Sequence, residues 1–154
     1  MYFERQSGGN CRIHAINTFF GKSKITPKQL CEYAIQFDQE YSVLNPHNNS
    51  AEFDRVCSDG LMLVSFIIEQ IDPTLCSFCA PIGTSGFFED MLLDQCVPAV
   101  LCFNVGHIWS FKQDDTGQWW NLDSLQSGPT KINRSSMIKT LTSPKHGSIL
   151  FCKK

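Results

Sequence analysis

The sequence predicts an α+β fold in which an N-terminal helical layer packs on a C-terminal antiparallel sheet. In the first half of the chain apolar residues recur with a helical period, whereas short apolar runs separated by turn-forming residues follow Pro73. Hydrophobic residues make up 42% of the 154 residues and charged residues 18%, which is enough apolar material for one core. Residues 1–154 are therefore expected to form a single domain.

The first two helices have clear boundary signals. One begins at Cys11, where Asn10 is available as the cap residue, and Gly21 ends it. The second begins within Thr26-Pro27-Lys28-Gln29, because this segment has the residue types of a capping box and places proline at the first helical position. The apolar stripe of the second helix consists of Leu30, Ala34, Phe37 and Tyr41.

A third helix is expected from about Asp59 to Ile71, where Asp72-Pro73 stops it. The segment 43–58 before this helix contains a run of Asn, Pro, His and Ser, which favours turns over packing, so it is the expected mobile loop. Further on, residues 87–93 are compatible with a short helix between two strands.

Strands are expected in the second half of the chain, where the apolar pattern changes its period. Asp114-Asp115-Thr116-Gly117 has the residue types of a tight turn and predicts a hairpin. The expected strands are residues 74–79, 97–103, 107–112, 118–122 and 148–152.

Charge and the N-terminal sequence narrow the classes of function. Thirteen basic and fifteen acidic residues give a net charge of -2, without the basic excess of a surface that binds nucleic acid. The longest apolar run, residues 60–68, is far shorter than the roughly 20 residues that span a bilayer, so no membrane helix is expected. Because residues 1–10 are unlike a secretory signal, the protein is expected to be cytoplasmic, or delivered to a host cytosol if it comes from a pathogen.

Cys11 has the position of a catalytic nucleophile, whereas most of the eight cysteines are expected to be reduced core thiols. Unpaired N–H groups at a helix N-terminus stabilise a thiolate. The glycine-rich segment 7–10 allows a close approach of the backbone to a substrate, and the amide of Gln6 is a candidate donor to an oxyanion. On its position alone, a packing role for Cys11 is the alternative.

His107 and Asp123 form a second candidate cluster, with one residue on each arm of the expected hairpin. Because their midpoint falls inside the turn, they are expected opposite or diagonally adjacent across the ladder. An imidazole oriented by a carboxylate is the base that a cysteine nucleophile needs. Asn121 should share the face of Asp123, while Trp120 and Leu122 point into the core. The alternative is a surface His–Asp pair.

Other residues with ligand chemistry are weaker candidates. Cys76 and Cys79 have the spacing of zinc ligands, but no second pair follows at a suitable distance, and a strand would place them on opposite faces. No metal site is therefore expected. His14 is expected to pack in the first helix rather than act as a second base, and His47 and His146 are expected at the surface.

Two blocks of the sequence carry a further signal: residues 6–17, QSGGNCRIHAIN, and residues 107–129, which contain HIWSF and QWWNLDSLQSGP. In order, spacing and residue type they resemble the Josephin family of papain-like cysteine proteases. That family has a glutamine five residues before its catalytic cysteine, a His-Trp-Phe strand and a Trp-Phe-Asn-Leu-Asn/Asp-Ser-Leu segment. In this chain Ile108 stands where the family usually has tryptophan, and the insert after the second helix is short.

The resemblance implies a papain-like Josephin fold and a deubiquitinase that cleaves after the C-terminal Gly-Gly of ubiquitin or polyubiquitin. It implies that Cys11 is the nucleophile, His107 the general base, Asp123 the orienting residue and Gln6 the oxyanion donor. A monomer without a cofactor is expected. Two alternatives stay open: a Cys–His–Asp protease or acyltransferase acting on another ubiquitin-like modifier or acyl substrate, and a non-catalytic ubiquitin-binding module.

Overall fold

The structure is a computed structural model that describes residues 1–41, 57–83 and 96–154. The helices in these ranges are α1 (Cys11–Phe20), α2 (Pro27–Tyr41), α4 (Cys57–Ile71) and α6 (Arg134–Leu141). The strands in these ranges are β1 (Leu75–Ala80), β2 (Cys96–Asn104), β3 (His107–Gln113), β4 (Trp119–Leu122), β5 (Thr130–Ile132) and β6 (Gly147–Lys153).

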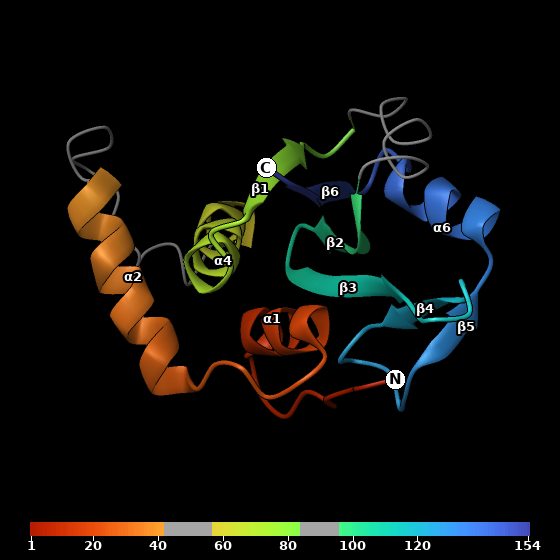
Figure 1. Cartoon of the computed structure of the whole chain (residues 1–154), viewed down its shortest axis with the longest axis horizontal. Helices are drawn as coiled ribbons and strands as arrows, with labels where there is room; N and C mark the ends of the chain where they lie inside the picture. The colour runs from red at the N-terminus through yellow and green to blue at the C-terminus, as the bar shows by residue number, and fades with distance from the viewer. Residues whose placement is uncertain (42–56, 84–95) are drawn as a thin grey trace.

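The strands form one sheet with the order β1-β6-β2-β3-β4-β5, in which every neighbouring pair is antiparallel. Helix α1 packs on β3 and β2, α4 packs on β1 and α1, and α2 packs on α4. Helix α6 lies on the opposite face of the sheet (Figure 1). The expected α+β fold, with an N-terminal helical layer on an antiparallel sheet, is confirmed, and α6 covers the second face.

The two faces of the sheet carry separate hydrophobic clusters, because successive side chains of a strand point to opposite faces. The cluster under α1 and α4 includes the buried residues Ile16, Leu63, Ile67, Leu101, Ile149 and Phe151. The cluster under α6 includes the buried residues Val100, Phe111, Trp119, Met137, Leu141 and Leu150. Since both faces are covered, the central strands are buried on both sides.

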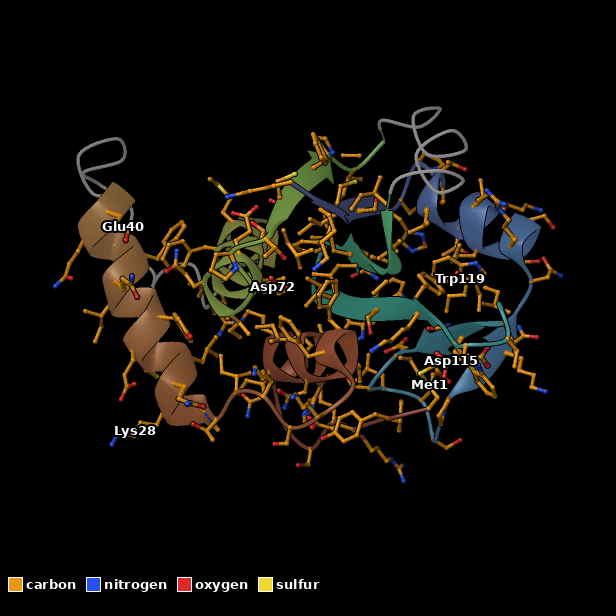
Figure 2. All side chains as sticks on the ribbon, viewed as in Figure 1. Met1, Lys28, Glu40, Asp72, Asp115 and Trp119 are labelled. Carbon is orange, nitrogen blue, oxygen red and sulfur yellow. The ribbon has the colours of Figure 1, made fainter. Side chains whose placement is uncertain are left out.

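The double covering of the sheet explains a wrong prediction on β4. Leu122 is buried as expected, but Trp120 is only half-buried, and its Nε1 donates to Asp114 Oδ2 at 2.8 Å. Trp119 takes the core position instead and lies between the sheet and α6 (Figure 2). Asn121 follows Trp119 by two residues, so its side chain points to the same face of the strand. In the described part of the chain, its Oδ1 is buried without a hydrogen-bond partner.

The helix boundaries follow from capping chemistry, with one exception. Gly21 ends α1 with a left-handed φ of 72°. At the start of α2, the N–H of Gln29 donates to Thr26 Oγ1 at 3.2 Å and the N–H of Thr26 donates to Gln29 Oε1 at 2.9 Å, which confirms the capping box. Asn10 is the N-cap residue of α1, but its side chain makes no capping hydrogen bond, because its ψ of 40° departs from the extended conformation that a side-chain cap needs.

The predicted hairpin is confirmed. Strand β3 pairs with β4 in a register that places Ser110 opposite Leu122 and Gln113 opposite Trp119. The turn between them is closed by a hydrogen bond from the N–H of Asp114 to Gln118 O at 2.9 Å. This register decides where the first residue of β3 and the residue just after β4 meet.

Strand β5 and helix α6 were not anticipated from the sequence. Strand β5 has three residues, which is too short for an alternating pattern to be visible. Helix α6 buries only Met137 and Leu141, one turn apart, among polar residues. The signal that could have found it is Asn133, whose side chain accepts a hydrogen bond from the N–H of Ser136 at 2.8 Å.

Part of the sequence interpretation lies outside the described residues. This applies to the short helix at 87–93, to His47 and to nearly all of the loop at 43–58. Within the described ranges, no helix has the length and hydropathy needed to cross a membrane.

Candidate active site

Cys11 is the first residue of α1 and is 7% exposed. Because α1 packs on β3, the thiol meets the start of that strand, close enough to the imidazole of His107 and the backbone of Ile108 for both to lower its pKa. The segment 7–10 in front of the thiol is exposed, and Gly8 has a φ of 83°, a conformation that favours glycine. The predicted nucleophile therefore lies beside the predicted base, next to an exposed stretch of backbone.

His107 begins β3, and Asp123 follows directly after β4; their Nε2 and Oδ1 atoms are 2.6 Å apart. Since Ser110 pairs with Leu122, Asp123 is diagonal to His107, which is one of the two expected arrangements. The N–H of Leu125 also donates to Asp123 Oδ1 at 3.0 Å. The side chains of His107 and Asp123 are 10% and 15% exposed, so the alternative of a surface pair is wrong.

The contacts of the thiol and the imidazole favour an ion pair. Burial raises the pKa of Cys11, but hydrogen bonds with His107 and Ile108 and the charges of His107 and Arg12 lower it below its usual value. Burial lowers the pKa of His107, whereas hydrogen bonds with Asp123 and Cys11 and their charges raise it to about 9. Between these two pKa values the imidazole keeps its proton while the thiol has lost its own.

Asp123 remains a carboxylate under the same conditions. Burial raises the pKa of this carboxyl, but hydrogen bonds with His107 and the backbone of Leu125 lower it below its usual value. The charge of His107 and a hydrogen bond with Gln126 act in the same direction. A fixed negative charge therefore lies at Nε2 of the imidazole.

Gln6, the predicted oxyanion donor, is bound to the residue that follows Asp123. The N–H of Gln6 donates to Ser124 O at 2.7 Å, and the hydroxyl of Ser124 donates to Gln6 Oε1 at 2.9 Å. Nε2 of Gln6 donates to Gly8 O at 2.6 Å, which uses one of its two N–H bonds. The amide nitrogen therefore faces the segment in front of Cys11.

A polar network between the N-terminal segment and α1 was not anticipated from the sequence. The carboxylate of Glu4 accepts from Asn17 Nδ2 at 3.0 Å on each oxygen, lies 2.8 Å from His14 Nδ1, and also accepts from the hydroxyl of Tyr2. His14 thus packs against the N-terminal segment through its contact with Glu4. The three-residue spacing of His14 and Asn17, which puts both on one helix face, was the available signal.

Two ring contacts were also missed, one of the base itself and one of the tryptophan that stacks on it. Trp109 stacks on the imidazole of His107 with ring centroids 5.4 Å apart, and His146 meets Trp109 edge-on at 5.5 Å. His146, expected at the surface, is half-buried, and its Nδ1 lies 2.9 Å from Thr140 O. The prediction for His146 was wrong because it did not include α6, the helix that carries Thr140.

The Cys76–Cys79 pair lies on the edge strand β1. The thiol of Cys76 donates to Cys152 O at 3.5 Å, whereas Cys79 is exposed. Residues three apart on a strand point to opposite faces, so the two sulfurs do not converge on one point. Over residues 1–41, 57–83 and 96–154, no three metal-ligating side chains lie together.

Comparisons with known proteins give a match that includes both sequence blocks, residues 6–17 and 107–129. The family model described as Josephin matches residues 6–153. The protein named Ataxin-3 homolog from Caenorhabditis briggsae is 23% identical over 144 residues, which cover 90% of this chain and 43% of that protein. The chain thus spans less than half the length of this curated relative.

Proposed function

The chain belongs to the Josephin family, a family of ubiquitin-related cysteine proteases, and from this premise we propose that it is a deubiquitinating enzyme. The proposed reaction is hydrolysis of the bond after the C-terminal Gly-Gly of ubiquitin, with a Cys–His–Asp triad and an acyl-enzyme. One observation carries the proposal: the imidazole of His107 contacts both the carboxylate of Asp123, at 2.6 Å, and the thiol of Cys11. The family match supports treating residues 1–154 as one catalytic domain.

In the proposed mechanism Cys11 acts as a thiolate and attacks the carbonyl carbon of the terminal glycine of ubiquitin. As the C–S bond forms, the carbonyl π electrons move onto oxygen. Because Nε2 of His107 is bound to Asp123, Nδ1 is left to carry the proton beside the sulfur. Asp123 keeps the ring in this orientation and stabilises its cationic form.

The developing oxyanion is proposed to accept hydrogen bonds from the second N–H of the Gln6 amide and from the N–H of Cys11, which has no partner within the helix. Collapse of the intermediate breaks the C–N bond, and Nδ1 of His107 gives its proton to the leaving lysine amine. Water then attacks the thioester, its proton passes to His107, and the Cys11 thiolate leaves. These steps use side chains, backbone and water, so we propose no cofactor.

The proposal is tested with ubiquitin that carries a C-terminal propargylamide. The alkyne should form one covalent adduct, and digestion followed by mass spectrometry should locate it on Cys11. Cys11→Ser should form none, whereas Cys31→Ser, which removes an exposed thiol, should react like the original protein. Absence of an adduct, or an adduct on Cys31 or Cys79, would refute the proposal.

The same experiment decides between the proposal and its alternatives. Probes built on other ubiquitin-like modifiers are tested in parallel. Adducts with one of these and none with ubiquitin would indicate a protease for that modifier. Binding of ubiquitin without an adduct, measured by calorimetry, would indicate a non-catalytic module.

A further inference from the structure

Trp109 lies directly against the proposed base. Its indole ring and the imidazole of His107 are stacked, with centroids 5.4 Å apart and an angle of 17° between their planes. Both residues lie on β3, two positions apart, so their side chains leave the same face of the strand. Trp109 is 7% exposed and His107 8%, so the two rings meet largely away from bulk water.

Two further rings hold Trp109 in this orientation. Phe111 meets it at 6.4 Å with an angle of 64°, and His146 meets it at 5.5 Å with an angle of 86°. His146 is itself held by the contact of its Nδ1 with Thr140 O. In the described part of the chain, the indole N–H has no hydrogen-bond partner. Ring contacts, rather than a hydrogen bond, therefore fix the indole.

We propose that Trp109 is a positioning residue for the base, which holds the cationic imidazole of His107 in place through its aromatic face. The face of an indole attracts a cation that lies within about 6 Å of its centroid, and the observed stack is inside this range. The stack also restricts rotation of the imidazole, so Nε2 stays with Asp123 while Nδ1 faces Cys11. The inference rests on the proposed function only for the catalytic role of His107.

In this chain the tryptophan of β3 follows His107 by two positions. Ile108 stands where the Josephin family usually has tryptophan, and its side chain is buried in the cluster under α1 and α4. Trp109 is one residue later and belongs to the cluster under α6. A shift of one residue along a strand moves a side chain to the other face. The shift therefore brings an indole onto the face from which the imidazole of His107 leaves.

Trp109 has two opposite effects on the proton of His107, and this makes the proposal testable. As a bulky neighbour it excludes water, and burial lowers the pKa of His107. As an aromatic face it favours the cation and raises that pKa. The charged or titratable groups near the imidazole and its partners are Asp123 after β4, Cys11 and Arg12 of α1, Cys102 of β2, and His146 before β6.

The test measures the pKa of His107 by NMR titration of protein labelled with ¹³C-histidine, with the signal assigned by its loss in His107→Ala. Trp109→Phe keeps a smaller aromatic face, and Trp109→Leu keeps none at a comparable volume. We expect the pKa of His107 to be highest in the original protein, lower in Trp109→Phe and lowest in Trp109→Leu. The difference between the original protein and Trp109→Leu should be about 0.4–1.5 pH units. A rise in either variant would show that Trp109 acts only by excluding water and would overturn the proposal, as would an unchanged pKa.

Trp119→Leu is the matched control. Trp119 is 8% exposed and belongs to the same cluster as Trp109, but in the described structure the ring that stacks on His107 is that of Trp109. This variant should leave the pKa of His107 unchanged, and an equal fall would attribute the effect to packing in general. If Trp109→Leu does not fold, fluorinated tryptophan provides the second measurement, because fluorine weakens the negative face at nearly constant volume. The pKa should then fall with each added fluorine.

The titration needs no substrate, so it separates the two proposals. A protein that shows the expected order of pKa values but forms no adduct with the ubiquitin probe would keep this inference and refute the proposed function. An active enzyme whose His107 pKa does not respond to Trp109 would do the reverse. In the active enzyme, Trp109→Leu should lower kcat more than it changes KM, because the stack acts on the base rather than on ubiquitin.

Discussion

Replacement of Asp123 by alanine removes the negative partner of the proposed base, and its effect is predicted to depend on pH. With the pKa of His107 at about 9, about 97% of the imidazole is protonated near pH 7.5. Without Asp123, burial is opposed by Cys11 and the indole of Trp109 alone, so this pKa falls toward its ordinary 6.5, where only about 9% stays protonated. The thiolate–imidazolium pair should therefore become about tenfold scarcer near pH 7.5.

The assay measures alkylation of Cys11 by iodoacetamide, resolved by peptide mass spectrometry across the pH range, together with kcat/KM on a fluorogenic ubiquitin substrate. In the original protein kcat/KM should fall as the pH rises through about 9, where His107 loses the proton that it gives to the leaving amine, whereas alkylation needs only the thiolate and should not fall there. In Asp123→Ala this alkaline limb should move toward neutral pH. Asp123→Asn should retain more activity, because its carbonyl still accepts a hydrogen bond from the ring.

His107→Ala should be the least active of the three variants, since no imidazole then deprotonates the thiol or protonates the amine. Asp115→Ala, at the exposed tip of the hairpin, serves as the control and should behave like the original protein (Figure 2). The reasoning fails if Asp123→Ala keeps the original alkaline limb. It also fails if Asn121→Ala is more damaging than Asp123→Ala, since Asn121 would then be the better candidate for the third member of the triad.

Three further predictions concern single residues. Gln6→Ala should lower kcat by ~10²–10³ in single-turnover kinetics while the Kd for ubiquitin stays nearly unchanged; an equal loss of binding would contradict a role in the transition state. At neutral pH, Cys11 should react with iodoacetamide far faster than the exposed thiol of Cys79, whose pKa is raised by partial desolvation, and site-resolved rates in the opposite order would contradict an activated thiolate. Gly147→Ala should lower the free energy of unfolding by about 1–3 kcal/mol in urea titrations, because a Cβ there would overlap the ring of Phe103 and lie 2.8 Å from Ala80 O. Gly128→Ala, with nothing within 4 Å of the added Cβ, is the control, and an equal loss there would refute the steric argument.

The parts of the fold that the sequence predicted are those with local signals. The capping box at Thr26 and the turn at 114–117 each act within a few residues, and the elements that the structure describes between them, α2, α4, β1, β2 and β3, are of the predicted type. Helix α6 has weak local signals, and its apolar face becomes meaningful only when a sheet surface is available to cover it. The interpretation of His146 failed for the same reason, since its neighbours come from α6 and β3.

For the candidate site, the sequence could indicate which residues lie near one another but not how they are held. The pairing of His107 with Asp123 follows from the hairpin, because residues placed symmetrically about a turn meet across it. The hydrogen bonds of Gln6 with Ser124 join positions 118 residues apart, and no periodicity links them. The stack of Trp109 on His107 depends on a choice of side-chain rotamer, which a sequence pattern does not specify.

The N-terminal segment has a consequence for proteolysis of the protein. Through Glu4 it is bound to α1, the helix that carries Cys11, and through Gln6 to Ser124, which follows Asp123. Residues 4–6 thus form a noncovalent bridge between the two halves of the proposed triad. The N-terminal end lies near β4 and β5, whereas the C-terminal end lies beside β1 at the other edge of the sheet (Figure 1). Proteolytic loss of residues 4–6 would therefore remove this bridge while leaving Cys11, His107 and Asp123 in the chain.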